Sequence, residues 1–240
     1  MLCGIVAFTG TRSYDCMANT DIMFVYSRWN AALDQSIGSS VKYRIITGFL
    51  DDYFAPLVQA QAQRIRAKLS SAGARKIVTV LDENSLDDAR WHTGHELQRD
   101  NYRYILEMVL ETPWLGVLFK PKVTRTIRRR LGPVNELLMA AEKTGRCFIF
   151  EDASIDQTSA PPLLLGFAAD VCVQGHLCAG TAGLSCALAG LPTLLVDPEG
   201  TPYSRLNQLP RGKVVFKSWP ETIAALMEHF ERPGGIPGFG

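Results

Sequence analysis

The sequence has almost no excess of charge of either sign. Its 240 residues hold 25 lysines and arginines against 24 aspartates and glutamates, so the net charge is +1. A strong basic excess is typical of chains that bind nucleic acid or an anionic membrane surface, and its absence argues against nucleic acid as a partner. The apolar fraction of 47% is that of a globular protein, and the length allows a sizeable core.

The cysteines form no Cys-x-x-Cys pair, and no histidine pattern at metal-ligand spacing accompanies them. Most of them lie in apolar runs, where a free cysteine behaves as a small hydrophobic residue. We therefore predict no metal site and a reducing, cytoplasmic setting. The six are Cys3, Cys16, Cys147, Cys172, Cys178 and Cys186.

No segment has the pattern of a signal peptide or a membrane span. The N-terminal run MLCGIVAFTG has no basic residues before it and is ended by Arg12 and Asp15. The stretch from Leu177 to Val196 carries no charge and is long enough to span a bilayer. Its glycines and its proline divide it, however, into a short helix and a buried strand.

From Lys76 onward, short apolar runs alternate with longer amphipathic stretches. Continuous apolar strands separated by helices predict a parallel sheet with both faces covered. The fold class is therefore α/β, a doubly wound Rossmann-like domain over about residues 74–232. The strand-like runs are 76–85, 114–122, 147–152, 170–175, 192–197 and 213–218, and the helical stretches are 101–111, 134–145, 162–169, 180–190 and 219–230.

Two of these helices have recognisable ends. Gly145 suits the left-handed residue that closes a helix, and Ser218 or Pro220 can begin the last one.

Upstream of this domain the elements are fewer. Residues 20–27 and 43–48 predict strands, with a small helix between them, and residues 51–73 predict a long connecting helix. Residues 1–50 thus match the last βαβ unit of a preceding domain rather than a whole domain. The tail at 233–240 is rich in glycine and proline and is expected to be loose.

A turn of small residues, Gly180-Thr181-Ala182-Gly183, follows the fourth predicted strand and opens a helix. Parallel sheets bind ligands beyond the carboxyl ends of their strands. The first-turn N–H groups and the dipole of a helix favour an anion such as a diphosphate. Thr181 could cap the helix or donate its hydroxyl to a phosphate. Close packing of the helix on the strand would require the same small residues, so both interpretations stay open.

Lys120 and Lys122 flank Pro121 at the carboxyl end of the second predicted strand, on the same sheet edge as this turn. Two ammonium groups there would neutralise a diphosphate. The basic run continues into a predicted helix, and we expect most of its arginines to lie on a solvent-exposed face. These are Arg125, Arg128, Arg129 and Arg130.

Three segments together resemble the C-terminal domain of GT-B glycosyltransferases, most closely the group that makes bacterial capsules and surface polysaccharides. They read LGVLFKPK, LLMAAEKTGRCFIFED and AADVCVQGHLCAGTAGLSCALAGLPTLLVD. Sugar-nucleotide 2-epimerases of the same superfold share the last pattern. YRIITGFLDDYF resembles the crossing from the N-terminal domain in the same group, and the resemblance covers about residues 20–230.

The resemblance implies a nucleotide-sugar donor, with its diphosphate on the turn formed by Gly180, Thr181, Ala182 and Gly183. Such domains place an acidic residue early in the next helix, where it holds the ribose hydroxyls. Ser185 stands at that position and lacks the charge. Asp197 and Glu199, which follow the next strand, are the alternatives for this contact.

In the family, the acceptor site and the usual catalytic base belong largely to the N-terminal domain. Only the last part of that domain matches here, so we expect the chain to be incomplete at its N-terminus. His176, next to the small-residue turn, is the candidate catalytic residue. His92 and His95 lie in a polar stretch that could overhang the cleft, whereas Asp15, Asp51 and Asp52 are expected in turns or helix caps.

The leading hypothesis is a glycosyltransferase that passes sugar from a nucleotide-sugar to a glycan or lipid-linked acceptor, without a cofactor. No Asp-x-Asp motif is present, so stabilisation of the leaving diphosphate would come from N–H groups and lysines. A 2-epimerase and a non-catalytic nucleotide-sugar-binding module are the alternatives. Contact with the inner face of the membrane, a homo-oligomer and a partner subunit also remain open.

Overall fold

The computed structural model describes residues 17–49, 51–87, 93–150, 161–177, 180–200 and 204–232, with backbone alone for Asp51 and Asp52. Asp15, His92 and the predicted tail at 233–240 lie outside these ranges, as does the start of the predicted N-terminal unit.

The centre of the fold is a six-stranded sheet in which every neighbouring pair is parallel. Its strand order is β5-β4-β3-β6-β7-β8. The predicted α/β class, with a doubly wound parallel sheet, is therefore confirmed. The strands are β3 (Lys76–Leu81), β4 (Leu115–Lys120), β5 (Cys147–Ile149), β6 (Val171–Gln174), β7 (Thr193–Val196) and β8 (Val215–Phe216).

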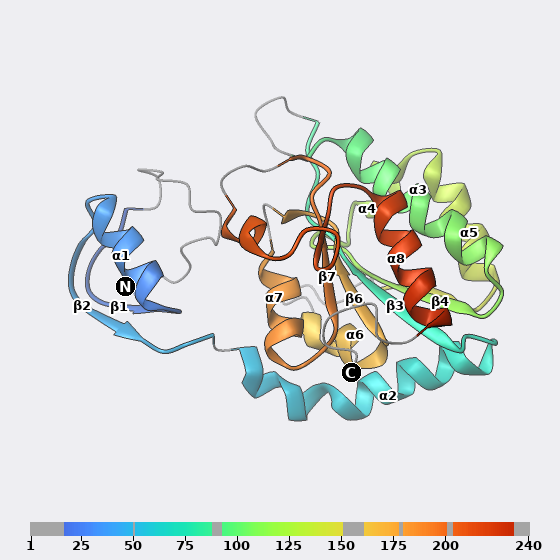
Figure 1. Cartoon of the computed structure of the whole chain (residues 1–240), viewed down its shortest axis with the longest axis horizontal. Coiled ribbons are helices and arrows are strands. Elements are labelled where there is room, and N and C mark those ends of the chain that lie inside the picture. The colour runs from blue at the N-terminus through green and yellow to red at the C-terminus, as the bar shows by residue number, and fades with distance from the viewer. Residues whose placement is uncertain are drawn as a thin grey trace.

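Helices cover both faces of this sheet (Figure 1). The alternation along β3 shows why, because Val78 and Val80 pack into one apolar core while Ile77 and Leu81 pack into the other. The first core includes α3 (His95–Glu111), α5 (Val134–Lys143) and α8 (Trp219–Glu231), and the second includes α2 (Ala55–Ser71), α6 (Pro162–Ala168) and α7 (Thr181–Leu188). A short helix, α4 (Ile127–Leu131), follows β4.

The predicted helix ends are found at both positions. Gly145 has φ of +73° just beyond α5, and its N–H donates to the carbonyl of Glu142. Ser218 caps α8 by accepting from the N–H of Glu221, with proline in the first turn.

The N-terminal unit is a βαβ arrangement, as the sequence predicts. Its strands β1 (Asn19–Val25) and β2 (Ser40–Ile46) are parallel, and α1 (Arg28–Ser36) connects them. A one-turn 3-10 helix, η2 (Asp51–Phe54), leads into α2.

Helix α2 packs against the sheet domain rather than only linking the two parts. Val58, Ala62 and Leu69 share the second core with residues of α6. Figure 1 shows α2 running along the sheet domain below α6. The Arg205 guanidinium, in the turn η4 (Arg205–Gln208), lies 4.8 Å from the Trp29 ring centre and joins the sheet domain to α1. Among the described residues, no helix has both the length and the apolar character to cross a membrane.

Candidate functional site

The candidate site lies where the strand order reverses. The chain proceeds outward from β3 to β4 and β5, and then returns to place β6 on the other side of β3. Loops that leave β3 and β6 therefore diverge at the carboxyl edge, which is where open α/β sheets bind ligands. Asp82 and Glu83 follow β3, and His176 follows β6.

His176 is fully buried between two carboxylates that belong to different loops. Its Nδ1 lies 2.6 Å from Glu199 Oε1, and its Nε2 lies 3.2 Å from Asp82 Oδ1. Burial lowers the pKa of His176, but the hydrogen bonds with Asp82 and Glu199 outweigh it and raise the pKa to about 9. Near neutral pH the protonated ring therefore donates to both carboxylates and ties the loops after β3, β6 and β7 together.

A third partner of His176 is Asn101 on α3. The Trp219 indole donates to Asn101 Oδ1 over 2.7 Å, which turns the amide nitrogen toward the ring at 3.1 Å from Nε2. A neutral Nε2 can accept from this amide, so the ring keeps a partner in either protonation state.

The network extends beyond Asp82 to a buried arginine. Asp82 accepts from the N–H of Glu83 at 2.8 Å and from Gln98 Nε2 at 2.7 Å. Gln98 Oε1 in turn accepts from Arg130 Nη1 at 2.9 Å. Hydrogen bonds thus connect Arg130, Gln98, Asp82, His176 and Glu199 in that order, over the carboxyl end of the sheet. This network links the loops that surround the switch point.

The predicted lysines lie at this same edge. Lys120 pairs with Leu81 in the β3–β4 register, is buried, and donates to the carbonyl of Pro121 at 3.3 Å. Lys122 is exposed and forms a 2.7 Å ion pair with Glu83. Lys120 is therefore a buried cation at this edge, and its backbone carbonyl accepts from the N–H of Asp82 at 3.1 Å. The charge of Lys122 is partly compensated by a carboxylate.

The small-residue turn is tightly packed in the structure. Helix α7 begins at Thr181 without a side-chain cap, and the N–H of Gly183 donates to Gln174 Oε1 at 2.9 Å. A Cβ at Gly180 would overlap the side chain of Leu206. Thr181 and Ala182 are half-buried, and Ser185 is buried. Close packing accounts for both glycines, and the binding of a phosphate by this turn remains a prediction.

Substitution of Gly183 by alanine tests the packing. The added Cβ would lie 2.9 Å from Gln174 Cβ and 3.4 Å from Leu195 Cδ2. We expect Gly183→Ala to lower the free energy of unfolding by about 2 kcal/mol. Gly94→Ala is the control, since a Cβ there meets nothing within 4 Å, and chemical denaturation of both variants measures the difference. Equal stability of the two variants would contradict the packing argument.

The two alternatives for the ribose contact are already engaged. Asp197 is buried and lies 3.5 Å from Arg211 Nη2, and Glu199 hydrogen-bonds to His176. His95 lies at the start of α3, with Nδ1 2.8 Å from Ser85 Oγ. Among the described residues, no group of three or more His, Cys, Asp or Glu side chains is arranged to hold a metal ion.

Most of the arginines are exposed as predicted, since Arg125 and Arg129 are exposed and Arg128 is partly exposed, where it pairs with Glu142. Arg130 is the exception, and it is buried because four acceptors surround its guanidinium. Asp82 is a residue of this site that the sequence did not single out. Its position directly after the first strand of the sheet domain was the available signal.

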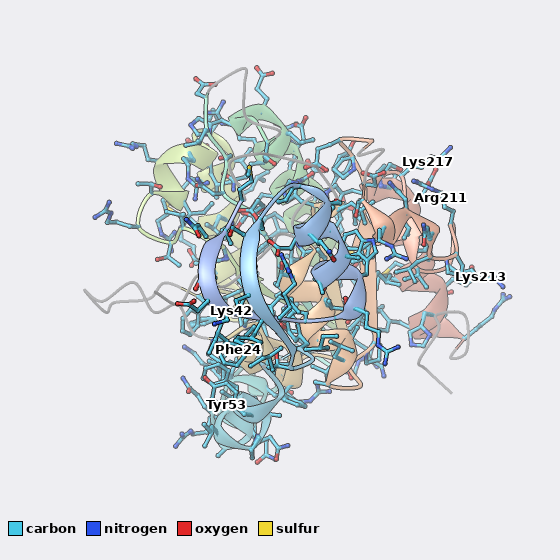
Figure 2. The ribbon with its side chains drawn as sticks, turned by 90° about the vertical axis from the view of Figure 1, so that its left-hand side faces the viewer. Phe24, Lys42, Tyr53, Arg211, Lys213 and Lys217 are labelled. Carbon is cyan, nitrogen blue, oxygen red and sulfur yellow. The ribbon has the colours of Figure 1, made fainter. Side chains whose placement is uncertain are left out.

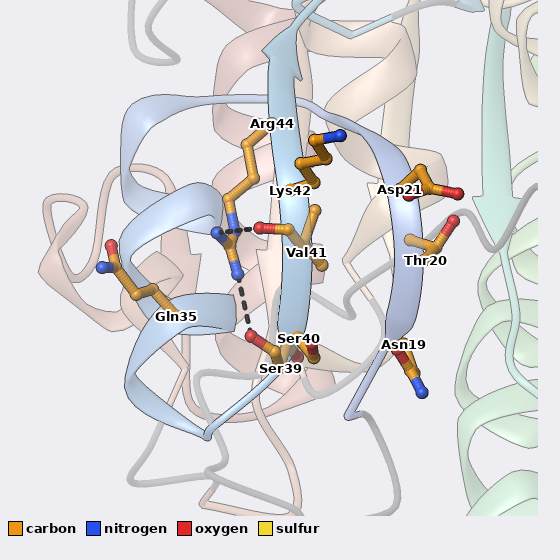
Figure 3. A pocket seen from close by; sticks show the side chains of 9 residues that line it. All are labelled: Asn19, Thr20, Asp21, Gln35, Ser39, Ser40, Val41, Lys42 and Arg44. Carbon is orange, nitrogen blue, oxygen red and sulfur yellow. Dashed lines mark hydrogen bonds between the residues drawn. The ribbon is translucent and has the colours of Figure 1, made fainter.

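One cavity, of about 600 Å³, lies in the N-terminal unit and is bounded by Asn19, Ser40 and Arg44, among others (Figure 3). It lies toward the amino ends of β1 and β2, away from the edge at which parallel sheets bind ligands. Another, of about 420 Å³, lies beyond the carboxyl ends of β7 and β8.

Comparisons with known proteins show the fold alone. No protein-family model matches the chain, and no curated protein matches it either. An α,α-trehalose-phosphate synthase (UDP-forming) from Burkholderia vietnamiensis is similar in structure at 12% identity and a TM-score of 0.50, over 89% of this chain and 53% of that chain.

A second similar structure is Anabaena HepE in complex with UDP and glucose, at 13% identity and a TM-score of 0.49, over 88% of this chain and 54% of that chain. The present chain thus spans about half the length of both structures. The parallel sheet flanked by helices is the fold that it shares with the synthase, and this supports the predicted glycosyltransferase fold.

Proposed function

We propose that the chain acts as a GT-B-type glycosyltransferase that takes sugar from a nucleotide-diphosphate-sugar, for the synthesis of a surface or capsular polysaccharide. The observation that carries this proposal is the position of Asp82, Lys120 and His176 at the carboxyl edge of a doubly wound sheet, with Asp82 and His176 in contact at its switch point. The shared fold supports it, and the polysaccharide product rests on the sequence resemblance.

In this proposal Lys120 stabilises the departing diphosphate, assisted by Lys122 and by N–H groups at the start of α7. Burial of Lys120 reduces solvent screening of its charge. His176 has hydrogen-bond partners at both nitrogens, so we assign it a positioning role that it exerts through Asp82 and Glu199. Catalysis would then consist of orientation and charge stabilisation.

Calorimetry with UDP, CDP and GDP tests donor binding. We expect one of these nucleotides to bind, and Lys120→Met to weaken that binding at least about tenfold, because a charge-assisted contact is lost. Lys143→Met, at the exposed end of α5, is the matched control and should bind like wild type. Equal affinity of all three proteins would place the diphosphate elsewhere.

A non-catalytic nucleotide-sugar-binding module is the second candidate. It is favoured by one observation, that both ring nitrogens of His176, the candidate catalytic residue, already lie within hydrogen-bond distance of protein carboxylates. The two functions are separated with a sugar-nucleotide that carries whichever base binds in the calorimetry. The release of free nucleotide from it is measured with and without glycan acceptors. Binding without release under any of these conditions would favour the module.

A further inference from the structure

The cavity beyond β7 and β8, called here the β7–β8 pocket, has a lining unlike that of the switch point. It measures about 420 Å³, within the usual range for small-molecule sites. Its charged lining consists of Asp197, Glu199, Arg211 and Lys217, and Asn207 completes the polar wall. The pocket therefore presents two cations and two carboxylates to one ligand-sized space.

The cationic side is partly preorganised. Arg211 hydrogen-bonds to Asn207 Oδ1 and lies 3.5 Å from Asp197 Oδ2, so two partners orient its guanidinium. Lys217 stands at the end of β8 with its side chain exposed. Figure 2 shows Arg211, Lys213 and Lys217 on the same side of the molecule, but Lys213 does not line the pocket. A guanidinium and an ammonium at one end of a cavity suit a phosphate.

The acidic side is held more firmly. The side chain of Asp197 is 2% exposed and that of Glu199 is 9% exposed. His176 holds Glu199 through the 2.6 Å hydrogen bond that also links it to the switch point. An ionised carboxylate only accepts hydrogen bonds and has about four acceptor sites, so each can accept from a sugar hydroxyl in addition to its protein partner.

We propose that the β7–β8 pocket binds a phosphorylated monosaccharide, as a second small-molecule site beyond the proposed nucleotide-sugar site. The balance of charges carries the assignment. Two carboxylates would repel a polyanion, and a neutral sugar would make no use of the exposed Lys217 ammonium beside Arg211. One phosphate together with several hydroxyl groups matches both ends.

Titration calorimetry with glucose 6-phosphate as the probe, and with glucose and inorganic phosphate as its two halves, tests this assignment. We expect saturable binding of glucose 6-phosphate, at least about tenfold tighter than either half. Arg211→Gln should weaken it about tenfold or more through loss of a charge-assisted contact. Lys213→Gln, two residues away and outside the lining, should bind like wild type. Lys217→Gln should also weaken binding, and its exposed side chain keeps the test valid if Arg211→Gln fails to fold.

Three results would overturn the assignment. They are no binding of glucose 6-phosphate to wild type, equal binding by the Arg211, Lys217 and Lys213 variants, and binding of inorganic phosphate as tight as that of glucose 6-phosphate. A parallel titration with UDP separates this proposal from the proposed function. If UDP binds and glucose 6-phosphate does not, only the proposal for the β7–β8 pocket is contradicted. If glucose 6-phosphate binds and UDP does not, only the proposed nucleotide site is contradicted.

Discussion

Replacement of Arg130 by methionine is expected to lower the free energy of unfolding by about 3 kcal/mol. The guanidinium donates to four acceptors, which are Ser85 Oγ, Gln98 Oε1, Thr126 Oγ1 and the carbonyl of Val123. Methionine fills a similar volume but donates no hydrogen bond, so the buried acceptors lose a partner. Burial lowers the pKa of Arg130, in keeping with a cation surrounded by protein.

The matched control for this variant is Arg129→Met, on the same short helix with its side chain exposed. We expect Arg129→Met to change stability by less than about 0.5 kcal/mol. Urea denaturation of both variants and of wild type gives the comparison. If Arg130→Met were as stable as Arg129→Met, the network would have no structural role.

The second large effect is a loss of stability above neutral pH that depends on His176. The pKa of His176 is raised from its usual value of about 6.5 to about 9 in the folded protein. A raised pKa means that the folded state binds the proton more tightly. Its contribution is therefore complete below pH 6.5 and is lost as the pH rises through about 9. The difference corresponds to about 3 kcal/mol.

The pH dependence of urea denaturation between pH 6 and pH 10 measures this loss. His176→Gln provides the reference, because glutamine can hydrogen-bond but does not titrate. Buried thiols add their own loss at high pH, since burial raises the pKa of Cys147. The contribution of His176 is thus the difference between the two profiles, and parallel profiles would show that the buried ring is neutral.

The sequence determined the order and type of elements well because both faces of the sheet are buried. Each strand is then a continuous apolar run and each helix has an apolar stripe, as at Val78 and Val80 against Ile77 and Leu81. Turn chemistry fixed several ends, such as Gly145 and Ser218. The position of Lys120 at the carboxyl edge was also predictable from the sequence, because in a parallel sheet the direction of a strand determines which of its ends lies at that edge.

Only the tertiary structure decided which polar residues meet. Asp82, Asn101, His176 and Glu199 come from four separate segments, and no local pattern records that they converge on one buried ring. Arg130 is the same residue type as its exposed neighbour Arg129. Its burial depends on acceptors that α3 and the loop after β3 bring to it. Local interactions act over a few residues and specify elements, whereas the partners of a buried charge are set by how those elements pack.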